Sequence, residues 1–450
     1  MFSSERFFSN HAAFLILISL AFSITLPVAA QSNKLPVGVS ADNLVSSTRT
    51  GTMSIAQINQ RLKTVFGTSA PSPTSNAVDL YKVNYRSQDD NARPVILSGL
   101  VVLPQGGAPK GLVIFNHGTT ADPNVSPSRY AGGAKPAEVE SVILAFASGG
   151  YAIAMPDYLG LGDHKGAHPY PLGDINSRSA IDLIEPARTL AERQNVNVGS
   201  RLFVTGYSEG GAVAMWTVRN LEQKSSVMTP LSLRNLGQKS GAIYDVFAAA
   251  AMEGPYDLSG TTRNWLLDEP TDQEGFVIRL YLMSYMVYYF HKNRGVKLTD
   301  YFKPLMALAV SQAYGANRSD EDIVKRLAVT AVLMRSKNSI DNVITKRFKN
   351  ALQTLDTSDP VISEMRKNDV YDWKPRTKML LVTLKEDKIV DPGNTERVFQ
   401  TMRRNGVGDA MLRKYVINDL SLNHLTAIPP ALIQARRFFD DGFTSLSAPK

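Results

Sequence analysis

The chain has 450 residues, of which 44% are hydrophobic and 20% charged, and it carries a net charge of +8. This balance excludes an intrinsically disordered or fibrous protein and provides for a large apolar core. There is no cysteine, which excludes disulfides, thiol nucleophiles, cysteine-ligated zinc and iron–sulfur clusters. The cationic excess is small and no basic run contains interleaved aromatics, so we expect no nucleic-acid partner and at most a weak attraction to anionic surfaces.

The first thirty residues have the pattern of a secretory signal peptide. An apolar run from Ala12 to Leu26 follows a short polar start, and small residues (Pro27–Ala30) precede Gln31. The alternative is an uncleaved anchor, but the run is shorter than the roughly 20 apolar residues that a membrane span needs. We therefore expect cleavage after about Ala30, and a periplasmic or secreted bacterial protein, because secretion without cysteine suits a bacterium.

Residues 31–77 are polar and weakly periodic, with one helical stretch near Ile55–Phe66 and a linker-like segment at Ala70–Asn76. Beyond them, short apolar runs alternate with amphipathic stretches. The predicted strands are Ile96–Leu103, Leu112–Phe115, Tyr151–Met155, Leu202–Thr205, Val246–Met252, Met379–Thr383 and Arg413–Ile417. The predicted helices are Pro136–Ser148, Asn176–Gln194, Gly210–Leu221, Asn394–Arg404 and Ala427–Asp440. This alternation predicts an α/β fold with a mostly parallel sheet covered by helices on both faces.

The alternation breaks once, between about Leu258 and Lys374, where only helical periodicity is present. We interpret this stretch as an inserted helical cap. Its most apolar part, Phe276–Phe290, favours a buried helix, and the alternative is that its aromatics and methionines line an acyl-binding slot. The predicted organisation is a signal peptide (1–30), an N-terminal extension (31–77), a first core part (78–257), the cap (258–374) and a second core part (375–450).

A candidate nucleophile is Ser208, in the G-x-S-x-G pattern of Gly206–Gly210. The bare pattern recurs by chance, but here an apolar strand runs into it and a helical sequence leaves it, which is the arrangement that exposes a serine at a sharp turn. The backbone N–H of Glu209 at the helix start would then face a developing oxyanion. The alternative is a serine in an incidental glycine-rich turn.

A serine nucleophile needs a base and an acid. When the serine lies between a strand and a helix in this way, the acid and then the histidine are expected to follow it along the chain. Only His291 and His424 follow Ser208 in the chain. His424 comes shortly after a predicted strand, so we expect it to be the general base. The acid is expected after the strand Met379–Thr383. Asp387 is favoured because two residues, a valine and then a turn into a helix follow it, which is the usual arrangement around such an acid. Glu386, Asp391, which we expect to cap the next helix, and the earlier Asp257 remain alternatives.

The second oxyanion donor is expected after the strand Leu112–Phe115, in the segment Asn116–Thr120. The N–H of Thr119 is favoured, with Gly118 and Thr120 as alternatives, and His117 is expected to shape the loop. Asp157 precedes the nucleophile in the chain, so we expect a structural turn role for it. No metal-ligand or nucleotide-binding spacing occurs, so we expect neither a metal nor a cofactor, although calcium held by scattered carboxylates stays open.

These motifs occur in a fixed order along the chain: HGT at 117–119, PDYLGLG at 156–162, HPY at 168–170, GYSEGG at 206–211, GPYDLSG at 254–260, EDKIVDPGNT at 386–395 and NHL at 423–425. In them the sequence resembles the α/β-hydrolases, and within these the secretory lipases of the lipase-A-like group, over roughly residues 78–439. The resemblance implies a helical lid inserted after the sixth strand and hydrolysis of carboxylic esters, often acyl lipids, through an acyl-enzyme. The chain departs from the fungal relatives in lacking cysteine, which favours a bacterial branch, and it has Glu209 beside the nucleophile.

The sequence thus predicts a secreted esterase or lipase with the triad Ser208, Asp387 and His424 and the oxyanion donors Glu209 and Thr119. Its expected partner is a small-molecule or lipid ester, with room for transient contact with a lipid surface. A peptidase, an amidase or an acyltransferase on the same fold is the alternative, since the triad chemistry is shared among them. A binding module with a dead triad is disfavoured because all three residue types are present in order.

Overall fold

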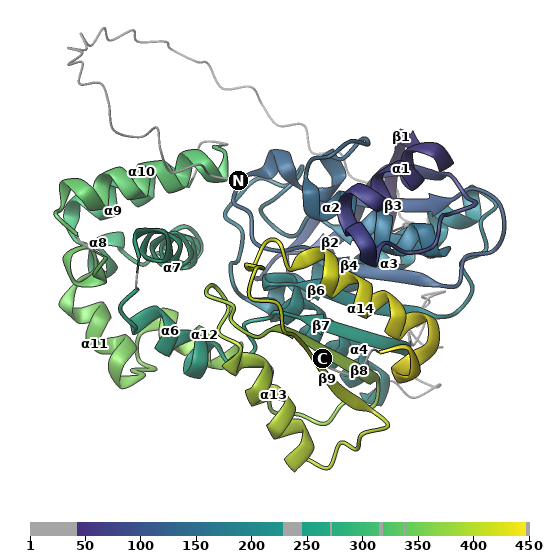
Figure 1. Cartoon of the computed structure of the whole chain (residues 1–450). Helices are drawn as coiled ribbons and strands as arrows, with labels where there is room; N and C mark the ends of the chain where they lie inside the picture. The colour runs from purple at the N-terminus through teal and green to yellow at the C-terminus, as the bar shows by residue number, and fades with distance from the viewer. Residues whose placement is uncertain (1–42, 228–244, 271, 315–317, 337, 447–450) are drawn as a thin grey trace, which may run out of the picture. The chain divides into compact units, whose positions relative to one another are not determined.

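The computed structural model describes residues 43–227, 245–270, 272–314, 318–336 and 338–446. Its centre is a nine-stranded sheet in the order β1-β2-β3-β5-β4-β6-β7-β8-β9 (Figure 1). The strands are β1 (Leu44–Met53), β2 (Val78–Gln88), β3 (Pro94–Pro104), β4 (Leu112–Asn116), β5 (Ala152–Pro156), β6 (Leu202–Tyr207), β7 (Val246–Met252), β8 (Lys378–Leu384) and β9 (Leu412–Ile417). The pairs from β5 through β4 to β9 are parallel, whereas β1, β2, β3 and β5 pair antiparallel. The predicted α/β fold with a mostly parallel sheet is therefore confirmed.

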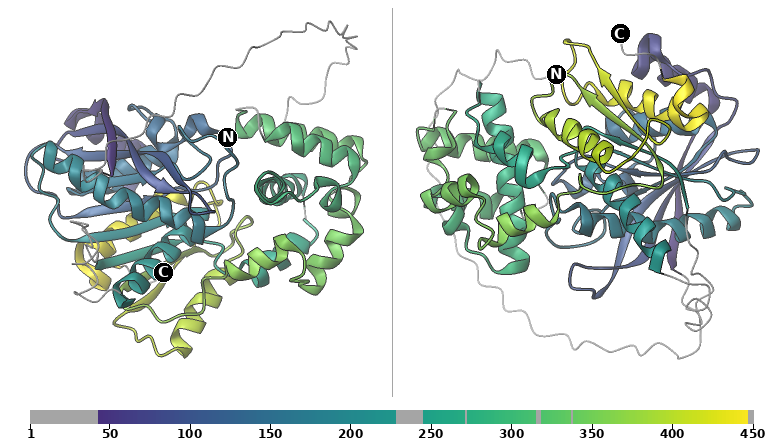
Figure 2. Two further views of the ribbon diagram at one scale, coloured as in Figure 1. Left: turned by 180° about the vertical axis from the view of Figure 1, so that it is seen from behind. Right: turned by 90° about the horizontal axis from the view of Figure 1, so that it is seen from below.

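The helices that surround the sheet are α1 (Ile55–Phe66), α2 (Ala137–Phe146), α3 (Gly173–Arg193), α4 (Glu209–Val227), α13 (Gly393–Arg404) and α14 (Ile428–Asp441). They form two layers, which the alternation of side chains along each strand explains. Leu202 and Val204 of β6 pack in one core cluster with α3, α4 and α13. Phe203 between them faces the opposite side and packs in a second cluster with α1, α2 and α14. Both faces of the sheet are thus covered, as Figure 2 shows from two further sides.

The stretch between β7 and β8 forms a helical cap with a hydrophobic cluster of its own. After a π-helical turn at Leu258–Thr262 it contains α6 (Arg263–Leu267), α7 (Gln273–Arg294), α8 (Leu298–Tyr301), α9 (Pro304–Ala313), α10 (Asp320–Leu333), α11 (Lys346–Thr354) and α12 (Pro360–Lys367). Figure 1 shows these helices grouped beside the sheet, with α7 enclosed by the others. Across the described ranges of the chain, we find no helix with the length and apolarity that crossing a membrane requires.

The two ends of the cap are hydrogen-bonded to each other. The Val370 N–H donates to the Tyr256 carbonyl at 2.9 Å, and the Ser259 N–H and hydroxyl donate to the Asp369 carboxylate at 2.9 and 2.5 Å. Because the segments before and after the cap meet in this way, the whole insertion leaves the core and returns to it at one place.

The amino-terminal segment from Leu44 onward is part of the core. Strand β1 pairs with β2 along most of its length, and α1 packs with α2 and α14 on one face of the sheet. Neither β1 nor β2 was among the predicted strands. In β1 only the first and last residues, Leu44 and Met53, are buried, so this edge strand lacks the apolar alternation that identifies a strand. The predicted signal peptide lies outside the described residues.

An ion pair ties this segment to the layer of helices. The Glu140 carboxylate is almost fully buried in α2, and the Arg61 guanidinium on α1 donates to both of its oxygens, at 2.6 and 2.7 Å. The pair therefore joins α1 to α2, beside the apolar contacts of Ile58, Leu62 and Phe66. We expect Arg61→Ala to leave a buried charge unpaired.

That substitution is expected to reduce the free energy of unfolding by about 2–3 kcal/mol, less than the loss of a fully buried pair because the Arg61 side chain is 32% exposed. Urea unfolding followed by circular dichroism measures it. Lys63→Ala, an exposed position on the same helix, is the control and should change stability by less than about 0.5 kcal/mol. Equal stabilities of the two variants would mean that the Arg61–Glu140 pair does not stabilise the fold.

Candidate active site

Ser208 sits at a sharp turn between β6 and α4, at the carboxyl edge of the parallel strands. Its φ of +57° is in the left-handed region, which costs a residue with a side chain strain energy and so indicates a position held by its surroundings. The Ser208 N–H donates to the Met252 carbonyl at the end of β7 (3.0 Å), and the Ser208 carbonyl accepts the Gly211 N–H (2.8 Å). The backbone on both sides of the serine is therefore fixed, and its hydroxyl projects from the turn.

Three glycines allow this turn to form. A Cβ on Gly210 would overlap the Asn116 carbonyl of β4, and one on Gly211 would overlap the Met252 carbonyl of β7. A Cβ on Gly206 would overlap the Gly210 carbonyl and lie 2.7 Å from the Asn116 carbonyl oxygen. Helix α4 can therefore start this close to the neighbouring strands only where the chain has no side chain.

The structure brings Ser208 together with the predicted base and acid. His424 Nε2 lies 2.9 Å from Ser208 Oγ, and His424 Nδ1 lies 2.5 Å from Asp387 Oδ2. His424 and Asp387 are both buried, and the Tyr207 hydroxyl donates to the His424 carbonyl at 2.6 Å, which fixes the backbone of the histidine. This relay of a hydroxyl, an imidazole and a carboxylate can activate a serine as a nucleophile.

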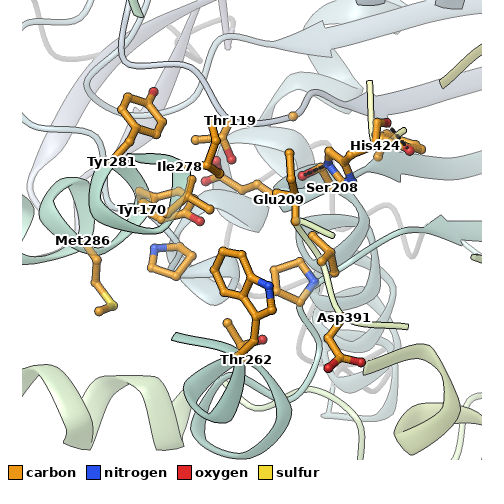
Figure 3. A pocket seen from close by; sticks show the side chains of 18 of the residues that line it. Thr119, Tyr170, Ser208, Glu209, Thr262, Ile278, Tyr281, Met286, Asp391 and His424 are labelled. Atoms are coloured by element: carbon orange, nitrogen blue, oxygen red, sulfur yellow. Dashed lines mark hydrogen bonds between the residues drawn. The ribbon is translucent and has the colours of Figure 1, made fainter. Parts of the chain in front are cut away.

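The surroundings of Asp387 keep its carboxylate charged. Burial alone would raise the pKa of Asp387, but the hydrogen bond and charge of His424, together with the N–H groups of Ile389 and Val390 on Oδ1, lower it below its ordinary value. Of the alternative acids, Glu386 is exposed, and Asp391 accepts the Gly393 N–H at 2.7 Å. Figure 3 shows Asp391 apart from Ser208 and His424.

A second buried carboxyl group, which the sequence interpretation missed, lies behind the acid. Glu253 follows β7 with a φ of +49°, is 1% exposed, and accepts the Leu384 N–H. Burial, and after it the negative charge of Asp387, raise the pKa of Glu253 well above its ordinary value, which favours its protonated form. The negative charge of this pair therefore stays on Asp387, next to the imidazole. The sequence signal that could have identified Glu253 is its position directly after a parallel strand.

The candidate oxyanion donors are the N–H groups of Glu209 and Thr119. Both residues line the cavity in front of Ser208, and among the described residues no protein acceptor bonds either N–H. Of the two alternatives to Thr119, the Gly118 N–H is already donated to the Glu138 carboxyl group, at 3.0 and 3.1 Å from its oxygens. Thr120 does not line the cavity, and its hydroxyl donates to Asp320 of the cap at 2.7 Å.

The side chain of Glu209 has a structural role. Its Oε1 lies 2.8 Å from His168 Nε2 and accepts from the Asn176 amide at 3.1 Å, while His168 Nδ1 lies 3.0 Å from the Leu159 carbonyl. Both nitrogens of His168 thus face oxygen atoms, and a hydrogen bond joins the imidazole to the carboxyl group across the 2.8 Å contact. The pair anchors the first residue of α4, and thereby its N–H, beside the nucleophile.

The loops of the PDYLGLG and HPY motifs support the segment that carries Thr119. Tyr158 stacks on His117 with ring centroids 4.2 Å apart and on His168 at 5.6 Å, and its hydroxyl donates to the His117 carbonyl at 3.1 Å. Asp157 is fully buried and accepts from the Ser98 hydroxyl at 2.5 Å and from a backbone N–H of the preceding loop. His117 and Asp157 thus have the loop-shaping roles that the sequence suggested.

The remaining candidates lie away from the triad. Asp257 caps the π-helical turn by accepting the N–H and hydroxyl of Thr261, at 3.0 and 2.9 Å. His291 lies in the last turn of α7, with Nδ1 2.8 Å from the Val296 carbonyl. In the ranges that the structure describes, no three acidic or histidine side chains are arranged to hold a metal ion.

In front of Ser208 lies a cavity of about 390 Å³, a size typical of small-molecule sites. The core contributes the polar rim with Ser208, His424 and Thr119, whereas the opposite wall comes from the cap (Figure 3). The cap wall is largely apolar: Leu258, Trp265, Leu266, Ile278, Leu282, Met283, Met286 and Met365 line it. Helix α7 is therefore both the buried helix of the cap and part of the wall of a slot, so the two interpretations of Phe276–Phe290 hold together.

The sheet order, the serine turn between β6 and α4, and the acid and histidine after β8 and β9 define the α/β-hydrolase fold. Similar solved structures include the rice cell wall degrading esterase LipA from Xanthomonas oryzae in a ligand-bound form (TM-score 0.71, 20% identity, 88% of this chain and 98% of that chain). A protein from Legionella pneumophila with a provisional description as a hydrolase has a TM-score of 0.75 at 23% identity, covering 90% of this chain and 99% of that one.

Candida antarctica lipase A is a more distant neighbour, with a TM-score of 0.60 at 14% identity over 92% of this chain and 86% of its own. At these identities the likeness shows the shared fold, and the predicted α/β-hydrolase architecture is confirmed. No protein-family model matches the sequence, and no curated protein matches it either.

The choice between the two aspartates can be tested by the reactivity of Ser208. Asp387→Asn should slow the labelling of Ser208 by a fluorophosphonate by about 10³–10⁴-fold, because the imidazole loses its orienting carboxylate and the correct tautomer. Asp391→Asn is the matched control and should react within about threefold of the unmodified protein. Stopped-flow or gel-based labelling measures both rates, and the reverse order would assign the acid to Asp391.

Proposed function

We propose that this protein is a secreted serine hydrolase that cleaves carboxylic esters with an apolar acyl group. The observation that carries the proposal is the hydrogen-bonded relay from Ser208 through His424 to Asp387, which opens onto a largely apolar cavity with two unengaged N–H groups beside the serine. Nucleophile, base, acid and oxyanion donors are then all present in one site. The esterase and lipase among the similar folds support the same reaction class.

In this mechanism Ser208 Oγ attacks the ester carbonyl carbon while its proton passes to His424 Nε2. The carbonyl oxygen becomes an oxyanion and accepts hydrogen bonds from the N–H groups of Thr119 and Glu209. Asp387 stabilises the imidazolium without taking its proton. The oxyanion collapses, the C–O bond to the alcohol breaks, and His424 donates its proton to the leaving oxygen. Water, activated by His424, then releases the acid from the acyl-enzyme by the same steps, and no cofactor is needed.

The cap wall favours an apolar acyl group as the substrate part that fills the cavity. Burying methylene groups against Ile278, Leu282 and Met286 stabilises a bound acyl chain by about 0.8 kcal/mol for each group removed from water. Methionine side chains adapt to chains of different shape, which suits a range of acyl lengths. The cavity is limited to about 390 Å³. The end of an acyl chain too long for it must extend into solvent, and those methylene groups add less binding free energy.

A series of chromogenic acyl esters of increasing chain length tests the reaction and the cavity together. We expect kcat/KM to rise with chain length to a maximum at an intermediate length and then to fall. Ser208→Ala should lower turnover by at least about 10⁴-fold, since the covalent route is lost. Full activity in that variant would exclude the mechanism, and cleavage of acyl amides without ester turnover would indicate a peptidase or amidase instead.

A substitution on α7 tests whether this helix lines the acyl site. Ile278→Trp should fill part of the cavity and move the preferred acyl length downward, with the ratio of long-chain to short-chain kcat/KM falling at least about tenfold. Leu308→Trp, on the exposed face of α9, is the matched control and should leave this ratio unchanged. An unchanged ratio in Ile278→Trp would place the acyl chain elsewhere.

We also propose that residues 1–30 are a signal peptide removed on export, on the basis of the apolar run and the small residues before Gln31. When the full chain is produced in a Gram-negative host, the protein recovered from the periplasm or medium should begin at or near Gln31. Amino-terminal sequencing of that protein measures this, and a chain that still begins at Met1 would contradict it.

A further inference from the structure

One carboxyl group beside the nucleophile has no part in the mechanism above. Glu138 is the second residue of α2, lines the cavity, and accepts the Gly118 N–H with both of its oxygens, at 3.0 and 3.1 Å. Gly118 immediately precedes Thr119 in the loop after β4. A Cβ placed on Gly118 would lie 3.5 Å from Glu138 Oε1 and 3.6 Å from Ser208 Cβ, so the carboxyl group and the serine flank the same small space.

Glu138 lacks the cation that its neighbour on the same helix has. Glu140 also sits in the first turns of α2 and binds the Arg61 guanidinium through both oxygens, whereas the Gly118 N–H is the one hydrogen-bond donor on Glu138 among the described residues. Burial, and in addition the charge of Glu209, raise the pKa of Glu138 to about 8 against the pull of the Gly118 N–H. At neutral pH this carboxyl group therefore carries a proton.

We propose that Glu138 is a positioning residue of the oxyanion site, which holds the Gly118–Thr119 loop in place and must remain an uncharged acid during turnover. This rests on the proposed serine hydrolase function. The carboxyl oxygens engage the Gly118 N–H, so the next N–H along the loop, that of Thr119, is the one left for the substrate oxygen. A carboxylate at the same place would put a second negative charge beside the developing oxyanion and would oppose its formation.

Three other ionisable groups near Glu138 are kept neutral by burial. Burial raises the pKa values of Tyr158 and Tyr207 well above the ordinary value for tyrosine, and burial lowers the pKa of His117, so all three stay neutral. Glu209 is bound to His168, and Glu140, on the same helix, is bound to Arg61.

Across the cavity, His424 is the proposed base, and its partner Asp387 is held ionised. Glu253 is bound behind Asp387, and Lys135 and Pro136 precede the helix that carries Glu138. The alkaline side of the profile is thus assigned to Glu138.

The test compares the unmodified protein with Glu138→Gln from pH 6 to pH 10. Two rates are measured: kcat/KM for a neutral acyl ester and the rate at which a neutral fluorophosphonate labels Ser208. In the unmodified protein both should fall by about tenfold per pH unit above roughly pH 8, as one deprotonation requires. In Glu138→Gln, which keeps an acceptor for the Gly118 N–H without an ionisable group, neither rate should show this alkaline fall, whatever its level at pH 7.

An alkaline fall of equal size and position in Glu138→Gln would overturn the proposal. Glu140→Gln is the matched control on the same helix and should keep the alkaline fall of the unmodified protein. If Glu138→Gln does not fold, as judged by circular dichroism, Glu138→Asp replaces it: a displaced alkaline fall supports the proposal and an undisplaced one overturns it. A protein that reacts with the fluorophosphonate but hydrolyses no ester would instead contradict the proposed function, and the labelling profile would still decide the role of Glu138.

Discussion

The site depends on one steric constraint, the close approach of α4 to the ends of three parallel strands. The carbonyl groups of Asn116 on β4 and Met252 on β7 occupy the places where side chains of Gly206, Gly210 and Gly211 would otherwise lie. This contact forces the residue between the strand and the helix into a left-handed conformation, and that residue is Ser208. Because the helix starts there, its first free N–H is necessarily beside the hydroxyl, so the position of the nucleophile and one oxyanion donor have a single cause.

The carboxyl groups that surround this turn behave differently because their neighbours differ. Asp387 is held ionised by His424 and two backbone N–H groups, whereas burial and the charge of Asp387 favour the protonated form of Glu253 behind it. Glu209 is hydrogen-bonded to His168, and Glu138 accepts the Gly118 N–H. The same chemical group thus fills four roles in a small volume, and the carboxylate next to the imidazole is that of Asp387.

The sequence predicted the elements whose signals are local, and missed those that depend on distant partners. The central strands β4, β5, β6 and β8 were found because both of their faces are buried and their apolar runs are continuous. Strand β1 was missed because an edge strand with exposed serines and threonines has no such run. Ser208, Asp387 and His424 follow strands in a recognisable order, but the proton on Glu138 or Glu253 depends on which groups lie around them in space, and no spacing in the chain reveals that.

The hydrogen bonds that join Tyr256 and Ser259 to Asp369 and Val370 make the cap a closed loop with a fixed base. For such a loop the entropy of closure rises slowly with length, by about 0.6 kcal/mol for each doubling. Helices within it can therefore be lengthened, lost or exchanged at little cost to the sheet, while the triad stays as it is. Evolution can thus revise what this protein accepts separately from how it reacts, and a transplanted cap should bring its own selectivity with it.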